Sequence, residues 1–391
     1  MIKILLKPGK DQSILRYHPW IFSGAIKTIE GKPAEGELVI VYSDKNEFLA
    51  IGHYQIGSIA VRIISFEKVV IDYTFWKNKI LQSYQLRKNL GLTDDNNTNV
   101  YRLVHGEGDG LPGLIIDIYN NTAIMQSHSI GMYHVRNEIA RAITEIYNEK
   151  ITSIYDKSEA TLPFKANTGA KNEFISGSGQ PGEVLEYGNR FMVDWIEGQK
   201  TGFFIDQREN RKLVEMYAKD RSVLNMFCYT GGFSVYALRG GAKLAHSVDS
   251  SEKAIELTNQ NVALNFSNAR HEAYAEEAFN YLNNINDPYD LIILDPPAFA
   301  KHQSALSNAL QGYKRLNAKA MSKLKPGGIL FTFSCSQVVS KDQFRQAVFS
   351  GATIAKRNLR ILHQLTQPAD HPINIYHPEG EYLKGLVLYS E

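Results

Sequence analysis

The chain has 391 residues, too many for one ordinary domain core and enough for two or three domains. Its hydrophobic content of 43% and charged content of 21% are typical of a folded protein, and no apolar run is long enough to predict a transmembrane helix. The apolar part of residues 1–7 is too short for a signal peptide. Two cysteines exclude a disulfide framework, and no Cys/His spacing indicates a metal site, so we expect a cytoplasmic protein. A formal net charge of +2 permits nucleic-acid binding only through a local patch.

Residues 1–72 are predicted to form a small β-rich domain. Short β-branched runs at Leu38–Tyr42, Phe48–Gly52 and Ile59–Ile64 are separated by Gly, Asp and Asn. The segment 16–24 places aromatic and basic side chains next to one another, and such a cluster can stack on RNA bases. The alternative interpretation is an aromatic core anchor that precedes a turn.

Residues 73–182 are predicted to form a second, mixed α+β domain. The expected elements are a basic amphipathic helix over 73–90, strands over 101–104, 113–119 and 122–126, and a further helix over 131–149. A polar linker or mobile loop over 161–182 closes the domain. The loop 105–113 is rich in turn residues, and its acidic pair, Glu107 and Asp109, could hold a ligand or could simply accompany a turn.

Residues 183–391 show repeated strand–helix alternation. The strands are expected at 222–227, 244–249, 289–295 and 329–335, with helices at 233–239, 251–264, 276–284, 305–324 and 341–355. This pattern predicts an α/β fold with a parallel doubly wound sheet and a ligand at its switch point. Two closing runs, Leu359–Leu365 and Leu383–Tyr389, predict an antiparallel hairpin at the sheet edge.

Two strand-end motifs indicate the chemistry of this third domain. Leu291–Phe299 and Phe331–Ser336 are apolar runs that end abruptly in polar or Pro-rich residues. Loops just past the carboxyl ends of parallel strands are where ligands bind, so Asp295, Phe299 and Cys335 are expected in one crevice. A carboxylate, an aromatic ring and a thiol in one crevice suggest chemistry on a nucleobase.

A third motif, Leu224–Phe233, is typical of a nucleoside-binding strand, Gly turn and helix start. Gly231 permits close approach of the backbone to a ligand, and Asp249 ends the next strand at the place where an acid holds ribose hydroxyls. The spacing is not GxGxxG and no GxxxxGK[ST] is present, which favours a mononucleoside-like cofactor over a dinucleotide or ATP.

Together these segments resemble a class I S-adenosylmethionine-dependent methyltransferase. More closely, they resemble the large-subunit ribosomal RNA cytosine-5 methyltransferases that carry an N-terminal PUA domain. The resemblance is carried by 18–24, 107–114, 198–208, 225–233, 295–301, 334–336 and 379–385. These motifs are less specific for the modified base, because related enzymes modify guanine.

The resemblance implies S-adenosyl-L-methionine as cofactor, large-subunit ribosomal RNA as partner, no membrane association and a homodimer as one possible assembly. It places the cofactor against Asp206, Gln207, Asn225, Phe227, Tyr229, Gly231, Asp249, Ser250, Glu277 and Asp295. Glu277 stands where the family commonly has Asp, so the adenine contact there is one methylene longer. The Arg-rich segment of the family is replaced here by residues 156–161, which weakens the case for RNA contacts at that place.

The same resemblance implies covalent catalysis. C5 of cytosine attacks a sulfonium methyl only after a thiolate adds at C6, and Cys335 is the expected nucleophile. Asp295 is expected to hydrogen-bond the base edge, while Pro296 and Phe299 contact a flipped base. Glu379 is a candidate for the group that removes the C5 proton. A buried structural role is the alternative for Cys335 and the expected role of Cys228.

Two other functions fit the same motifs. The first is methylation of guanine N7 or of an exocyclic amine, because Asp-Pro-Pro followed by an aromatic residue is also typical of amino methylation, which needs no thiol. The second is an RNA-binding protein with a degenerate catalytic domain, against which the presence of Asp249, Asp295 and Cys335 argues.

Overall fold

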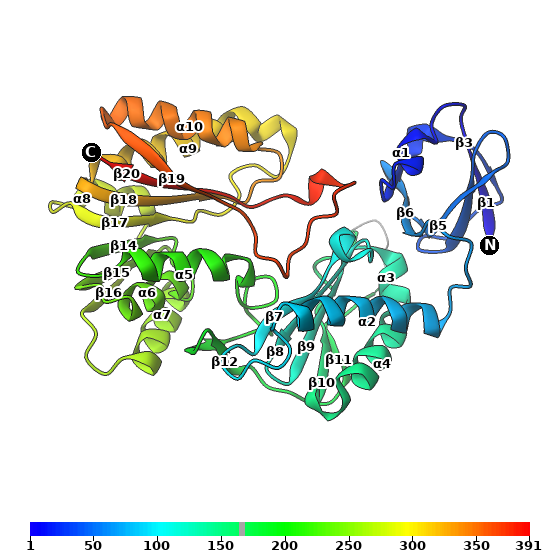
Figure 1. Ribbon diagram of the computed structural model, residues 1–391, viewed down its shortest axis with the longest axis horizontal. Helices are drawn as coiled ribbons and strands as arrows, with labels where there is room; N and C mark the ends of the chain where they lie inside the picture. Colours follow the sequence, from blue (N-terminus) through cyan, green and yellow to red (C-terminus); the bar gives the residue numbers. More distant parts are fainter. Residues whose placement is uncertain (164–168) are drawn as a thin grey trace. The chain divides into compact units, whose positions relative to one another are not determined.

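The computed structural model of the chain describes residues 1–163 and 169–391 (Figure 1). The chain forms two compact units. The first contains residues 1–184, 193–205 and 369–380, and the second contains 185–192, 206–368 and 381–391. The predicted domain boundaries near residues 72 and 182 stay a prediction. None of the described helices is long and apolar enough to cross a membrane.

The first unit begins with a six-stranded sheet of order β2-β6-β5-β4-β1-β3. Its strands are β1 Ile2–Leu6, β2 Trp20–Phe22, β3 Ile26–Glu30, β4 Leu38–Tyr42, β5 Phe48–Tyr54 and β6 Ile59–Ser65. β1 and β4 are parallel, and the other pairs are antiparallel. Buried side chains such as Ile4, Val39 and Val61 form its core. This confirms the predicted β-rich start of the chain.

A second sheet of the first unit has the order β11-β10-β9-β8-β7. Its strands are β7 Val100–His105, β8 Leu114–Tyr119, β9 Thr122–Ser127, β10 Ser153–Asp156 and β11 Glu173–Ser176, and its helices are α2 Tyr73–Asn89, α3 Ile130–His134 and α4 Arg136–Tyr147. Trp76 and Ile80 of α2 pack with Ile139 and Ile143 of α4 in one core. The linker predicted over 161–182 is wrong at β11, which pairs with β10; residues 164–168 of that prediction lie outside the described residues.

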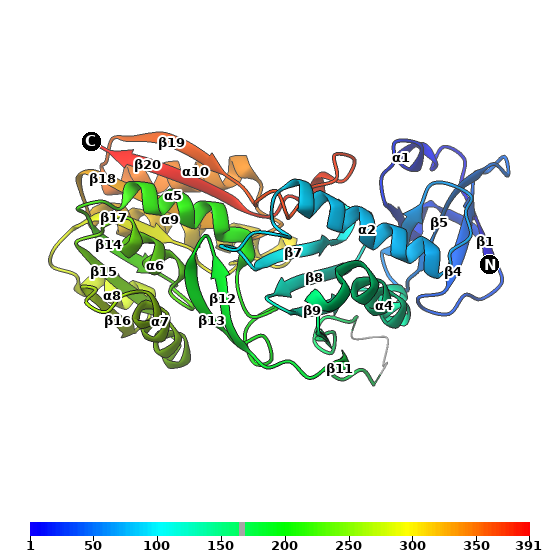
Figure 2. The ribbon, with the colours of Figure 1, turned by 60° about the horizontal axis from the view of Figure 1, so that its bottom comes forward.

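The second unit contains a seven-stranded sheet of order β16-β15-β14-β17-β18-β20-β19 (Figure 2). Its elements are α5 Arg208–Tyr217, β14 Ser222–Met226, α6 Gly232–Arg239, β15 Leu244–Asp249, α7 Glu252–Asn265, β16 His271–Ala275, α8 Ala278–Asn284, β17 Tyr289–Leu294, α9 Leu306–Ser322, β18 Leu324–Ser334, α10 Lys341–Ala355, β19 Leu359–Leu365 and β20 Lys384–Ser390. The five strands β16, β15, β14, β17 and β18 are parallel to one another, and β20 is antiparallel to both β18 and β19. The predicted doubly wound sheet and its antiparallel edge are confirmed. A short pair, β12 Gly182–Glu186 and β13 Asn189–Val193, precedes this sheet in the sequence.

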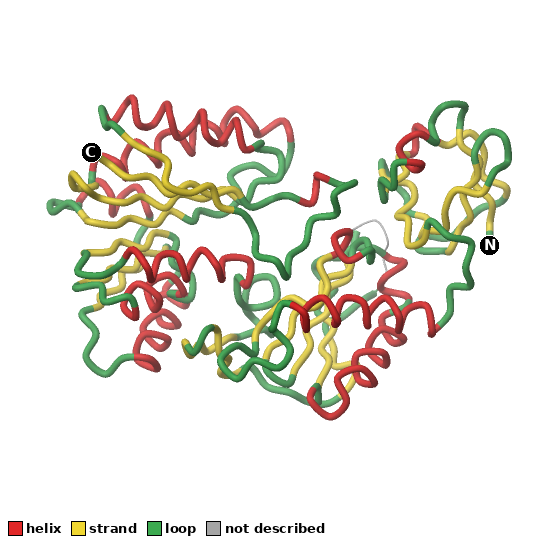
Figure 3. Tube along the Cα trace, in the orientation of Figure 1, coloured by secondary structure: helices red, strands yellow, loops and turns green. Residues whose placement is uncertain are grey.

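Both faces of this sheet are covered by helices, as Figures 1 and 3 show. Ile292 and Leu294 of β17 pack on the side of α8, α9 and α10, whereas Leu291 and Ile293 pack on the side of α5 and α6. Burial on both faces explains why β17 is a continuous apolar run instead of an alternating one. The carboxyl ends of the parallel strands are therefore left as the open edge.

Candidate active site

The carboxyl ends of the parallel strands bring most of the predicted site residues to one edge of the sheet. Glu277 follows β16, Asp249 ends β15, the turn 227–231 follows β14, Asp295 follows β17 and Cys335 follows β18. These strands are neighbours in this order, although their ends lie far apart in the sequence. This is the edge at which ligands bind in open α/β sheets.

The turn after β14 has a backbone that few sequences can form. Phe227, Tyr229 and Gly231 all have positive φ, of 60°, 48° and 76°. A Cβ atom on Gly231 would lie 2.7 Å from Cγ2 of Thr258, so glycine is required there for space as well as for conformation. The chain can therefore turn tightly from β14 into α6, whose N-cap is Gly231.

Asp249 holds this turn in place from the neighbouring strand. Its Oδ2 accepts a hydrogen bond from the Tyr229 amide at 3.0 Å, and its Oδ1 accepts one from the Ser251 amide at 3.0 Å. Thr258 of α7 donates to the Tyr229 carbonyl at 2.9 Å. Ser250 and Glu277 are exposed at the same edge. A ligand bound here would meet a turn that its surroundings already fix.

Among the described residues, two buried acceptor oxygens of predicted cofactor residues have no hydrogen-bond partner. Oδ1 of Asp206 is one, while its Oδ2 accepts from the Tyr382 hydroxyl at 2.7 Å. Oδ1 of Asn225 is the other, while its amide nitrogen donates to Ser234 at 2.9 Å. Buried unsatisfied acceptors are costly, and a ligand that carries N–H or O–H donors would satisfy them. The α-ammonium of a methionine moiety is such a donor, so these residues fit S-adenosylmethionine.

The Asp295 carboxyl is electrostatically unusual. Burial raises its pKa from 3.8 to about 7, and repulsion from Asp206 acts in the same direction. A hydrogen bond from Gln207 and the positive charge of Arg211 oppose this rise. Near neutral pH the group is therefore divided between a proton-donating and a proton-accepting form.

Arg211 was not predicted as a site residue. It lies on α5, which was also not predicted, and forms a buried two-pronged ion pair with Glu186: Nε to Oε1 is 2.8 Å, and Nη2 to Oε2 is 2.6 Å. The hydroxyl of Tyr236 donates to the same carboxylate at 3.0 Å. The spacing of Leu213, Val214 and Tyr217 is the signal that could have indicated this helix.

Cys335 lies between two buried serines at the end of β18. Its thiol donates to the Pro296 carbonyl, with Sγ 3.9 Å from the oxygen, so the thiol reaches the loop that carries Asp295. The hydroxyls of Ser334 and Ser336 lie 2.9 and 3.0 Å from the Tyr313 hydroxyl, which fixes the backbone on both sides of the thiol. Cys335 is partly exposed, so a substrate can reach it.

The second cysteine has a different environment. Cys228 is buried, and burial raises the pKa of its thiol to about 12, while its sulfur lies 3.6 Å from the Thr258 hydroxyl. A thiol held neutral in this way is a poor nucleophile. The contrast leaves Cys335 as the reactive candidate.

Phe299 is less open than the sequence suggested. Its ring packs against Tyr313, with centroids 4.6 Å apart and planes inclined by 31°, and an added Cβ on Gly312 would approach it to 3.0 Å. One side of the ring is therefore occupied by the protein itself. Contact of Phe299 and Pro296 with a base stays a prediction.

Lys384 is a residue of this site that we did not predict. It lies on β20 opposite Ser334 and is only 4% exposed. Its ammonium donates to the carbonyls of Ser336 at 2.7 Å and Val339 at 2.9 Å. Burial lowers its pKa to about 8, against the attraction of Cys335. A lysine inside an otherwise apolar strand run was the sequence signal for it.

In the first unit, the acidic pair of the loop 105–113 binds the protein's own groups. Glu107 Oε1 accepts hydrogen bonds from Trp20 Nε1 and Arg62 Nη1, both at 2.8 Å. Asp109 forms a buried ion pair with Arg87. The pair thus ties together separate segments of this unit.

A Gly turn, an acid on the next strand and a carboxyl–thiol pair on a doubly wound sheet define the class of nucleoside-cofactor group-transfer enzymes. Comparison with known proteins gives the family. The model of the S-adenosylmethionine-dependent methyltransferases matches residues 156–375, more than half of the chain, and a PUA-like domain matches 4–66. The chain belongs to the S-adenosylmethionine-dependent methyltransferase family, and the predicted cofactor is confirmed.

Several relatives are similar over almost their whole length. A protein of Tolumonas auensis named ribosomal RNA large subunit methyltransferase I is 41% identical over 98% of both chains, and one of the same name from Enterobacter sp. is 38% identical over 98% of both. Among solved structures, a protein of Streptococcus mutans described as a SAM-dependent methyltransferase is 25% identical, with a TM-score of 0.85 over all of both chains. A methyltransferase crystallised with SAH is also 25% identical over the full length, with a TM-score of 0.86.

Proposed function

We propose that this protein methylates C5 of a cytosine in large-subunit ribosomal RNA, and that Cys335 forms a transient covalent bond to the base. The names of the relatives support the RNA substrate. The observation that carries the cytosine chemistry is the pairing of a partly exposed thiol with the loop of Asp295, at 3.9 Å between Cys335 Sγ and the Pro296 carbonyl oxygen.

The chemistry assigns a role to each group. S-adenosylmethionine supplies an electrophilic methyl group when it is bound. The Cys335 thiolate adds to C6, which moves electron density into the ring and makes C5 nucleophilic. Asp295, with a pKa near 7, donates a proton or hydrogen bond to N3 as negative charge develops there. After methyl transfer a base takes the proton from C5, the electrons of that C–H bond re-form the C5–C6 double bond, and the sulfur–C6 bond breaks to release the Cys335 thiolate.

The proposed cofactor contacts follow the edge of the sheet. Asp206 and Asn225 face the methionine moiety through their unpaired oxygens, with Gln207 beside Asp206. The turn at Phe227, Tyr229 and Gly231 encloses the ligand. Asp249 at the end of β15, Ser250 directly after it and Glu277 after β16 are assigned to the ribose and adenine.

The test is a comparison of cysteine variants. We expect Cys335→Ala to abolish methylation of ribosomal RNA while S-adenosylmethionine affinity, measured by calorimetry, stays within about twofold, since the thiol is assigned to the base. RNA that carries 5-fluorocytosine should trap the wild-type protein as a stable adduct, because fluorine does not leave as a proton does. Cys228→Ala, at the buried thiol, is the matched control and should keep both methylation and trapping.

A specific observation also supports the amine-methylating alternative. Asp295-Pro296-Pro297 followed by the aromatic Phe299 can hold an amino group without a thiol. If Cys335→Ala methylates normally, or if the product is a methylated guanine, this alternative replaces the covalent mechanism.

Three further proposals concern RNA recruitment, location in the cell and oligomeric state. The PUA-like domain is assigned to RNA recruitment. The proposed ribosomal RNA substrate supports the proposal of a cytoplasmic protein. A homodimer is proposed as the assembly, to be measured by light scattering after size-exclusion chromatography. A monomeric mass over the working concentration range would refute it.

A further inference from the structure

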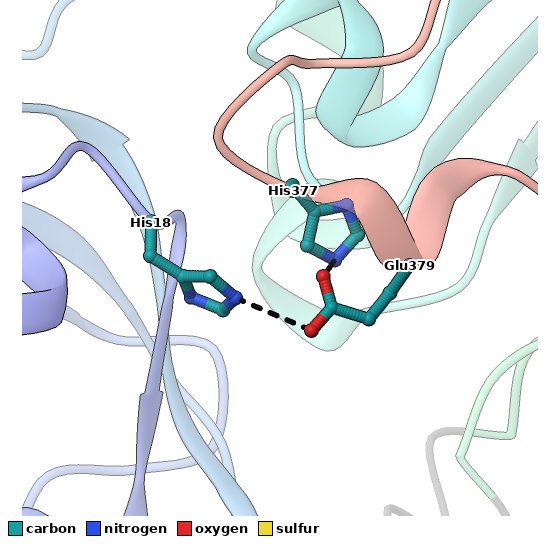
Figure 4. Close-up of side chains that lie close together, drawn as sticks. All are labelled: His18, His377 and Glu379. Carbon is teal, nitrogen blue, oxygen red and sulfur yellow. Dashed lines mark ion pairs between the residues drawn. The ribbon is translucent and has the colours of Figure 1, made fainter.

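Two histidines and a glutamate from opposite ends of the chain converge within the first unit. His18 lies between the short helix α1 (Gln12–Leu15) and β2, while His377 and Glu379 belong to the segment 369–380. His18 Nε2 lies 3.7 Å from Glu379 Oε1, and His377 Nε2 lies 3.8 Å from Glu379 Oε2. The carboxylate stands between the two imidazole rings, and one ligand atom from each residue falls within 4.8 Å of the others (Figure 4).

His377 is the observation that points to a ligand. The residue is only 3% exposed, yet neither ring nitrogen has a hydrogen-bond partner among the residues that the structure describes. Figure 4 shows the ring directed at the Glu379 carboxylate. At 3.8 Å this contact is too long for a hydrogen bond. Leaving buried polar atoms unsatisfied is costly, so the site is incomplete with the protein's own groups alone.

The donor set selects the kind of ligand. Two imidazole nitrogens and one carboxylate oxygen are ligands that Zn²⁺ prefers, whereas Mg²⁺ and Ca²⁺ prefer oxygen alone. In a tetrahedral zinc site with bonds of roughly 2.0–2.1 Å, the ligand atoms stand about 3.3 Å apart. The two contacts of Glu379, at 3.7 and 3.8 Å, require a small contraction that its half-exposed side chain can supply. The ligand atoms of the three residues lie within 4.8 Å of one another, so the two imidazoles must also move toward the ion when it binds.

The surroundings of His18 are suited to metal binding. Its Nδ1 lies 3.3 Å from the Trp20 carbonyl, so with Nε2 on a metal the Nδ1–H can donate to that oxygen. The Trp20 amide also approaches Nδ1, at 3.2 Å, which favours the other tautomer when no metal is bound. The Trp20 ring packs on His377 with centroids 4.3 Å apart and forms an apolar wall.

We propose that His18, His377 and Glu379 bind one Zn²⁺ ion, or a divalent ion of like chemistry, that clips the N-terminal domain to the segment 369–380. Three protein ligands leave a fourth position for water. Because the ligands come from distant parts of the chain, the ion closes a very long loop and stabilises the folded unit. The proposal does not depend on the proposed function, and it assigns Glu379 to the ion in place of the proton removal expected from the sequence.

The full-length protein, stripped of metal with EDTA, is titrated with ZnCl₂ by calorimetry. One equivalent should bind and raise the melting temperature. His18→Ala and Glu379→Gln should each weaken binding by more than about tenfold, since even outer-shell contacts contribute that much. His134→Ala, an exposed histidine of the same unit, is the matched control and should bind as the wild type does.

A second measurement is independent of how the variants fold. A wild-type crystal soaked in ZnCl₂ should give an anomalous difference peak at the zinc edge within bonding distance of all three side chains. A peak elsewhere, binding unaffected by His18→Ala, or no binding of ZnCl₂ to the wild type in the calorimeter would each overturn the proposal.

Discussion

At the scale of single residues, the Lys384 ammonium is the positive group that attracts Cys335. Its two hydrogen bonds go to the carbonyls of Ser336 and Val339. The side chain therefore fixes the segment after Cys335 in addition to placing a positive charge near the thiol. With a pKa of about 8, the side chain is mostly protonated at neutral pH and loses its charge in mildly alkaline solution. Its effect on the thiolate is therefore confined to pH values below about 8.

We predict that Lys384→Met slows alkylation of Cys335 by iodoacetamide on the order of tenfold at pH 7, the effect of moving a thiol pKa by one unit. The difference from the wild type should shrink as pH rises through 8, because Lys384 loses its charge over that range. Cys228 is buried and does not contribute to the signal. Lys219→Met, an exposed lysine of the same unit, should react like the wild type. Equal rates for Lys384→Met and the wild type at pH 7 would remove this role.

A second prediction at this scale concerns the pH dependence of stability. The folded-state pKa of Asp295 is raised. Between about pH 4 and 7 the folded protein therefore keeps a proton that the unfolded chain has already released. Its contribution to the free energy of unfolding therefore falls as pH rises through this window and is constant above it. We expect Asp295→Asn to become progressively more stable than the wild type from pH 5 to pH 7.5 in urea titrations. A stability difference that does not change with pH would show that the carboxyl is not perturbed.

At the scale of secondary-structure elements, the junction of β14 and α6 can be tested with two glycines. Gly231 and Gly241 both have positive φ, 76° and 86°, so alanine at either costs roughly 1–2 kcal/mol of backbone strain. Only at Gly231 does the new Cβ clash, at 2.7 Å from Thr258; at Gly241 the nearest atom is 3.7 Å away on Lys219.

We therefore predict that Gly231→Ala loses S-adenosylmethionine affinity by tenfold or more, because α7 or the turn must move. Gly241→Ala should lose a similar amount of backbone stability yet bind the cofactor normally. Calorimetry with the cofactor and urea unfolding of both variants separate the two effects. If both variants bind equally well, the turn does not set the cofactor site.

At the scale of the whole molecule, exposed aromatic side chains of the N-terminal domain are the expected RNA contacts. Tyr17 is 52% exposed and Phe22 is 48% exposed, both within the predicted aromatic-basic segment. The neighbouring Trp20 donates to Glu107 and packs on His377, so it serves as an anchor. Both interpretations of the segment 16–24 therefore apply: Trp20 is an aromatic anchor, and Tyr17 and Phe22 are the candidates for stacking on RNA bases.

We predict that the double variant Tyr17→Ala/Phe22→Ala binds ribosomal RNA more weakly by about 1–3 kcal/mol for each stacked base, with cofactor affinity unchanged. Phe349→Ala, an exposed aromatic residue of α10, is the control and should bind RNA like the wild type. Binding must be compared at the same salt concentration, because phosphate contacts depend on it. Unchanged RNA affinity in the double variant would exclude the aromatic patch.

The sequence by itself determined the layout of the second unit and the type of its ligand site. Runs such as Leu291–Leu294 are apolar at every position, which only a strand buried on both faces requires, and the Gly turn and Asp249 follow local rules of backbone and spacing. These features depend on near neighbours in the chain, so a linear pattern records them. The roles assigned to the site residues stay predictions.

Only the tertiary structure revealed the ion pair of Arg211 with Glu186, the strand β11, Lys384 beside Cys335 and the approach of His18 to His377 and Glu379. Arg211 acts through Glu186, and β11 exists through its pairing with β10. Spacing along the chain does not indicate His18 and Glu379 as a pair of candidate metal ligands, because they stand at opposite ends of the chain. Each of these features is an interaction between segments distant in sequence, and its energy arises only after folding has brought the partners within contact.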